Sequence, residues 1–136
     1  MRTRQHRMAP LVAFLFAVLF LCAGCNDTKR LVSQVKNAAP ALQWQAWAVQ
    51  VLERAKTNSS PVPRSEWPAF IASITPPCTE WQLFTGRNGS TSNISLVSLG
   101  GFGSFGIDIG PASFVEPTRP DEHCEQVYPG IYVVHN

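Results

Sequence analysis

The sequence predicts an α+β fold in which N-terminal helices pack on a small antiparallel β-meander. Apolar residues recur at helical spacing as far as about residue 74. From residue 79 onward, short runs of strand-forming residues alternate with turns rich in Gly, Pro and Asn. Helices followed by a run of strands are typical of the α+β class, so we expect one small domain of this class over residues 25–136.

The first residues of the chain are typical of an export signal. Three arginines precede an apolar run over residues 11–24, which ends in Ala23 and Gly24 just before Cys25. A basic head, a short apolar core and small residues before a break indicate a cleaved signal peptide. The run is shorter than the about 20 apolar residues that cross a bilayer. We therefore expect residues 1–24 to be a signal peptide. Three outcomes are compatible with this segment: removal with lipidation of Cys25 or, as alternatives, plain secretion or retention as a membrane anchor.

The end of this segment resembles the lipobox of bacterial lipoproteins, in which two small residues precede a cysteine. In that class the thiol receives diacylglycerol, the chain is cut before the cysteine, and the new N-terminus is acylated. The resemblance implies that Cys25 is lipidated and that the protein faces the periplasm from a membrane of the cell envelope. Cys22 stands where the class usually has Leu. In enteric lipoproteins an Asp directly after the cysteine retains the protein at the inner membrane; here Asn26 holds that place, which favours the outer membrane.

Loss of the signal changes the charge balance of the chain. Of its 11 Lys and Arg, three lie in the signal, which leaves 8 basic against 9 acidic side chains. No basic patch with interleaved aromatic residues remains, so the composition argues against a nucleic-acid partner. The remaining length suffices for one domain with a modest core.

Residues 25–63 are predicted to be helical and to end in a linker. Apolar spacing predicts one helix over 30–38 and, after a proline, an amphipathic helix over 41–56. The second helix carries Trp44 and Trp47. We expect both in the core, with a ligand platform as the alternative.

Residues 64–136 are predicted to contain a short helix and the sheet. We expect the helix over 66–74, with a proline in its first turn. Asn88 and Gly89 are a hairpin signal, and Pro129-Gly130 interrupts the last strand, which predicts an edge or bulged strand. The expected strands cover residues 79–85, 93–99, 105–109 and 127–134.

The stretch from Trp67 onward resembles a type of small bacterial α+β domain for which no activity is known. The resemblance rests on the Trp67-Pro68 step, the Gly-Gly-Phe-x-x-aromatic-Gly turn over 100–106, and a terminal Gly-Ile-Tyr strand over 130–132. It covers roughly half of the chain and implies the fold alone.

The glycine turn also contains the pattern G-x-G-x-x-G. A dinucleotide-binding loop requires a helix after the pattern, whereas Ile107-Asp108-Ile109 predicts a strand. A kinase glycine loop lies between strands, but the chain lacks the kinase's other motifs. We therefore expect no nucleotide and no other cofactor; a groove-forming loop for another ligand is the alternative. The expected structural turn, a bulged hairpin between Leu99 and Phe105, contains Gly100, Gly101, Gly103 and Gly106.

Cys78 and Cys124 are the two cysteines that remain after processing and lipidation. Because an exported chain enters an oxidising compartment, the pair predicts a disulfide. Such a bridge would stabilise the fold by roughly 4 kcal/mol in the chain-entropy model. Two free buried thiols are the alternative.

The remaining polar residues do not define a reactive site. Residues 121–125 include His123 and Cys124, but neighbours on a strand point to opposite faces, so we expect a solvated acidic loop and no metal ligands. His135 is the other histidine of the mature chain. No spacing of Ser, Cys and His indicates a catalytic set, so no catalytic residue is assigned. Asp108, between two isoleucines, is expected to face solvent.

Taken with the anchor, these patterns predict a non-catalytic binding or scaffolding domain at the membrane, with an envelope protein as partner. The alternative is a small inhibitor or immunity protein that acts on a secreted or envelope hydrolase. A small envelope enzyme is the third hypothesis, and it requires a pocket with convergent titratable groups.

Overall fold

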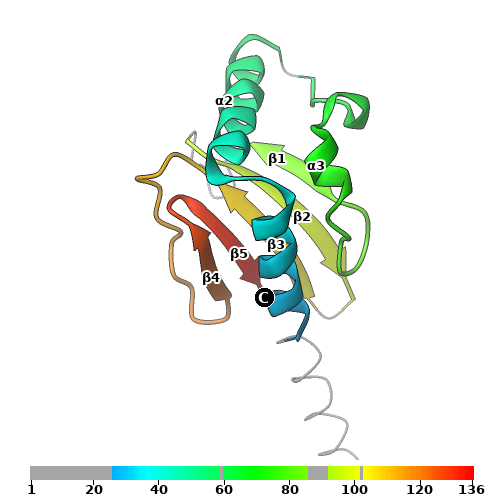
Figure 1. The fold of residues 1–136 in the computed structure, drawn as a ribbon, viewed down its shortest axis with the longest axis vertical. Helices are drawn as coiled ribbons and strands as arrows, with labels where there is room; N and C mark the ends of the chain where they lie inside the picture. Colours follow the sequence, from blue (N-terminus) through cyan, green and yellow to red (C-terminus); the bar gives the residue numbers. More distant parts are fainter. Residues whose placement is uncertain (1–25, 59, 86–91, 102) are drawn as a thin grey trace, which may run out of the picture.

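The helices lie N-terminal to a five-stranded antiparallel sheet, which confirms the predicted α+β class (Figure 1). The structure is a computed structural model that describes residues 26–58, 60–85, 92–101 and 103–136. The predicted signal peptide, Cys25 and the hairpin signal at Asn88-Gly89 lie outside the described residues. None of the helices in these ranges is both long enough and apolar enough to cross a membrane.

Three α-helices and one 3₁₀ turn precede the sheet in the described chain. The first covers residues 26–38, and α2 (Ala41–Thr57) follows it after Pro40, whose extended backbone ends one helix and caps the next. A 3₁₀ turn, η1 (Arg64–Glu66), then leads to the short helix α3 (Ala69–Ala72).

The predicted helix over 66–74 is wrong in length because of the Trp67-Pro68 step. Trp67 has extended backbone, with ψ 144°, as Pro after a residue demands. Pro68 is extended as well, so the chain forms two separate turns in place of one helix. This step leaves Trp67 between η1 and α3, outside both helical turns.

The strands are β1 (Gln82–Thr85), β2 (Ile94–Gly100), β3 (Gly103–Ile109), β4 (His123–Tyr128) and β5 (Ile131–His135). Their order in the sheet is β1-β2-β3-β5-β4, with antiparallel neighbours throughout. In a simple meander β4 would pair with β3. Here β5 lies between β3 and β4, so the last strand of the final hairpin pairs with β3.

Pro129-Gly130 is a turn between β4 and β5, so the prediction of one interrupted strand is wrong. The predicted edge position and irregular pairing are found in β4, which lies at the sheet edge and shifts register against β5 between Gln126 and Tyr128. Gly130 has φ 79°, and a Cβ there would lie 2.0 Å from the carbonyl oxygen of Pro111. Pro followed by a left-handed Gly is the central pair favoured by type II turns.

The core lies between the helices and one face of the sheet. Figure 1 shows the first helix and α2 crossing this face. Trp44 is completely buried and Trp47 is 4% exposed, which confirms that both belong to the core. Each large apolar side chain buried in this way stabilises the fold by about 1.5–3 kcal/mol. The helices contribute Leu31, Val35, Trp44 and Val51, and the strands contribute Ile94, Leu96, Ile107, Ile109, Ile131 and Val133.

Asp108 lies on the opposite face of the sheet and is completely buried, so the prediction that it faces solvent is wrong. It stands in register with Ser95 and Tyr132, which are also buried. The β3–β4 loop folds back over this face. The ring of Phe114 meets that of Tyr132 edge to face at 5.8 Å, and the Tyr132 hydroxyl donates to the Phe114 carbonyl at 3.1 Å.

Candidate binding groove

The glycine turn joins β2 to β3 as a hairpin. Pairing of the described residues runs as far as Gly100–Gly103 without a register shift, so the expected bulge is not part of it. Gly106 lies within β3, opposite Val97. Gly103 has φ 152°, and a Cβ there would lie 2.0 Å from the Asn136 carbonyl oxygen. The pattern G-x-G-x-x-G thus serves strand packing, with a strand and no helix after it.

Cys78 and Cys124 are free thiols, so the predicted disulfide is wrong. Cys78 is exposed and lies beside the end of β2, where its backbone N–H donates to the Ser98 hydroxyl at 3.1 Å. Cys124 lies on β4, with β3 and β5 between that strand and β2. Burial first, and then the carboxylates of Glu116, Glu122 and Asp108, together raise the pKa of Cys124 to about 11.

His123 and His135 lie opposite each other on β4 and β5 at one edge of the sheet. His123 pairs with His135, and the His135 ring stacks on Phe105 with 4.2 Å between centroids. Burial first, and His123 second, lowers the pKa of His135, while Asp27 raises it. Over the described ranges no three His, Cys, Asp or Glu side chains gather as metal ligands would. His123 and Cys124 point to opposite faces, as strand alternation requires.

A groove of about 380 Å³ lies between the η1–α3 segment and the start of the sheet. Two tryptophans from separate segments form its walls: Trp67 from the step between η1 and α3, and Trp81 from just before β1. Further apolar lining comes from Pro68, Ala69, Ile71, Ala72, Ile74 and Pro76. The groove has the size of small-ligand sites, which run from about 300 to 1,000 Å³.

Hydrogen bonds within the domain hold both indole rings. The Trp67 Nε1–H donates to the Val62 carbonyl and the Trp81 Nε1–H to the Ile74 carbonyl, each at 3.1 Å. Trp67 is half-buried and Trp81 is 5% exposed. Because both indole N–H donors are already used, what the two rings add to the groove is apolar surface. The groove therefore selects for apolar or planar groups.

One ion pair stands at the rim of the groove. Arg64 contacts Glu80 at 2.5 Å and donates to the Trp81 carbonyl at 2.6 Å, while its guanidinium lies 5.6 Å from the Trp67 ring centre. The Arg64 and Glu80 side chains are 51% and 82% exposed, so the pair adds little stability. Its effect is to place a donor and an acceptor beside the aromatic walls with no net charge.

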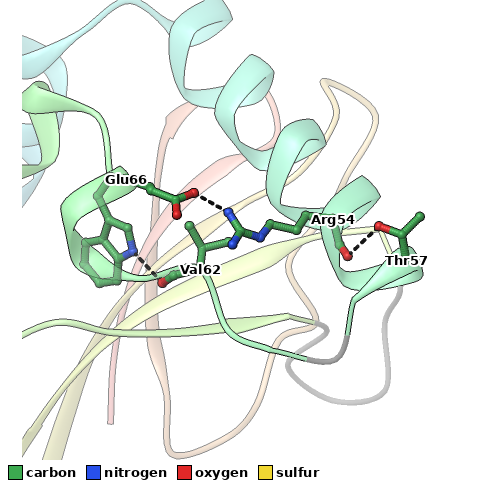
Figure 2. A network of polar contacts seen from close by, with 5 residues as sticks. Arg54, Thr57, Val62 and Glu66 are labelled. Carbon is green, nitrogen blue, oxygen red and sulfur yellow. Dashed lines mark hydrogen bonds and ion pairs between the residues drawn. The ribbon is translucent and has the colours of Figure 1, made fainter.

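A second ion pair ties the groove wall to the long helix. Figure 2 shows Arg54 on α2 reaching across to Glu66 in η1, beside the loop that carries Val62. The Thr57 hydroxyl donates to the Arg54 carbonyl at 3.1 Å, which fixes the last turn of α2. The segment from Val62 to Trp67 is thus positioned by α2 and not by the sheet alone.

The sequence pattern does not show that Trp67 and Trp81 line one groove. It predicts Trp67 at a helix entry and Trp81 on a strand, and their position in the same groove depends on the path of the chain through Pro76 and Pro77. The signal that could have indicated the groove is the concentration of Trp and Pro over residues 61–81.

Comparison of the chain with models of protein families, with curated proteins and with solved structures gave no match.

Proposed function

We propose that the protein is a lipid-anchored, non-catalytic binding domain of the cell envelope, with the Trp67–Trp81 groove as its binding site. The observation that carries this proposal is the pair of fixed indole rings that line one solvent-reaching groove. Grooves lined by apolar and aromatic side chains recognise ligands without covalent chemistry. Cys25 carries the anchor, because its place after Ala23-Gly24 fits the lipidation signal.

The ligand that suits this groove is an extended segment of an envelope protein, with a proline or an aromatic side chain at its centre. Grooves walled by aromatic rings bind Pro-rich extended chains because such chains lose little entropy on binding. The Arg64–Glu80 pair offers one donor and one acceptor to the backbone of such a segment. The rim carries no net charge, so it adds no preference for a charged peptide.

A blocking substitution tests the groove without disturbing the core. Ala72 is exposed and lines the groove, so Ala72→Glu introduces a carboxylate there. Ala46 is an exposed alanine on α2, away from the groove, and Ala46→Glu is the matched control. Displayed peptides are selected on the wild-type domain and counter-selected on Ala72→Glu, and their affinities are measured by fluorescence anisotropy.

We expect the selected peptides to share a central proline or aromatic residue. Ala72→Glu should weaken their binding by about tenfold or more, whereas Ala46→Glu should leave it unchanged. Peptides that bind both variants equally would refute the groove as the site. Capture of an envelope hydrolase through the groove, with loss of its activity, would identify the inhibitor hypothesis as the correct form of the proposal.

A further inference from the structure

We propose that one end of the domain lies flat against the bilayer that holds the anchor. This end, here called the basal end, consists of the start of the first helix, the β2–β3 hairpin and the segment at Cys78. The inference rests on the proposed lipidation of Cys25. It goes further because it fixes which surface of the domain meets the lipid.

The first observation is that the described chain is folded from its first residue, Asn26, so no spacer within it separates Cys25 from the folded core. Helix begins by Asn26, the residue directly after Cys25. Thr28 is 2% exposed and Leu31 is 1% exposed, so the first turn is already packed on the domain. One residue of extended chain spans at most about 3.6 Å. A lipidated Cys25 would therefore hold this turn within a few ångströms of the headgroups.

The second step is that other segments share this end. The carboxylate of Asp27, in the first turn, raises the pKa of His135, which lies near the end of β5. Asn136 exchanges backbone hydrogen bonds with Ser104 at 3.0 and 3.1 Å, next to the Gly100–Gly103 pair. Figure 1 places the start of the first helix, the C-terminus and the junction of β2 with β3 at the same end of the molecule.

The third step is the chemistry that the basal end exposes. Leu99 is 46% exposed. A Cβ added at Gly101 would have no neighbouring atom within 4 Å, so this position faces open space. Lys29 and Arg30 are exposed near the start of the first helix, where Arg30 pairs with Asp27 at 3.1 Å. An apolar tip flanked by long basic side chains is the arrangement that settles into the headgroup region, where the cations meet phosphate.

The opposite end of the molecule provides the control. In Figure 1, α2 ends at the far end from the start of the first helix. Lys56, in its last turn, is exposed and would stand away from the membrane. A probe at the basal end and a probe at Lys56 should therefore report different distances from the lipid.

The experiment uses the full lipidated protein in vesicles of phosphatidylethanolamine and phosphatidylglycerol, with or without brominated acyl chains. Native Cys78 carries a bimane fluorophore in a Cys124→Ala background. The matched probe is Lys56→Cys in a Cys78→Ser, Cys124→Ala background. We expect brominated lipid to reduce the Cys78 emission about twofold or more and to leave the Lys56 probe unchanged.

A second pair of variants tests the contact itself. Leu99→Asp should reduce the quenching at Cys78, whereas Leu42→Asp, at an exposed leucine on α2, should not. Equal quenching of the two probes in vesicle-bound protein overturns the orientation and leaves the anchor intact. Protein that does not float with the vesicles overturns the anchor, and the orientation with it.

Discussion

Gly101 and Gly103 stand two positions apart in one hairpin, yet only Gly103 needs to be glycine. Its φ of 152° and the 2.0 Å approach of a Cβ to the Asn136 carbonyl leave no room for a side chain. Gly101 has open space around it. The conformational demand of the turn is therefore concentrated at one residue.

This contrast predicts different costs for two identical substitutions. Gly103→Ala should lower the free energy of unfolding by about 1–3 kcal/mol, because the backbone would have to leave its conformation. Gly101→Ala should change it by less than about 0.5 kcal/mol. Urea unfolding of both variants measures the difference, and equal losses would show that the turn does not constrain Gly103.

The raised pKa of Cys124 predicts that the stability of the fold depends on pH in the alkaline range. Its folded pKa is raised from 9.0 to about 11, so between those values the folded state keeps a proton that the unfolded chain releases. The free energy of unfolding should therefore fall as pH rises from 9 to 11, and no such term should act below pH 9. Cys124→Ala should flatten this fall, whereas Cys78→Ala should keep it. An unchanged slope in Cys124→Ala would contradict the buried thiol.

At the scale of elements, the link between α2 and η1 matters most for the groove. Arg54 and Glu66 join a helix packed on the core to the loop that positions Trp67. Their side chains are 35% and 50% exposed, so the pair contributes at most about 1 kcal/mol to stability. Its effect should appear in ligand affinity more than in unfolding.

We therefore expect Arg54→Ala to weaken binding of the groove-selected peptides severalfold while shifting the melting temperature little. Lys56→Ala, which removes the Lys56–Glu53 pair from the same helix, serves as the control and should leave affinity unchanged. If Arg54→Ala preserved affinity, the ion pair would have no part in shaping the groove.

The sequence predicted elements whose signal is local. The spacing of Leu31 and Val35, and the alternation of Ile107 and Ile109, reflect one buried face and identified a helix and a strand. Asp108 was misjudged because the covering loop has no periodic pattern that reveals where it folds. The groove was missed for a similar reason: Trp67 and Trp81 meet only through tertiary packing.

The predicted disulfide failed for a reason of topology. The expected oxidising compartment and the even number of cysteines favoured a Cys78–Cys124 bridge. Neither observation contains information on the order of the strands in the sheet. Insertion of β5 between β3 and β4 moves Cys124 to the edge of the sheet away from Cys78. Turn chemistry at Pro129-Gly130 was the local clue to this arrangement.

For the whole molecule, the proposed anchor at Cys25 would decide where the groove works. Cys25→Ala should abolish incorporation of labelled palmitate and release the domain from the membrane fraction, because the acylated thiol is lost. Cys78→Ala is the control and should stay labelled and membrane-bound. Palmitate incorporation that persists in Cys25→Ala would place the lipid elsewhere.

The position of β5 has a consequence for incomplete copies of the chain. β5 is the last strand in the part of the chain that the structure describes, yet both of its edges are paired, with β3 on one side and β4 on the other. A chain that lost residues 131–136 would leave two open strand edges, Phe105–Ile109 and His123–Tyr128, ready to pair with other chains. Truncated copies should therefore aggregate or be degraded, because the sheet closes only when β5 is present.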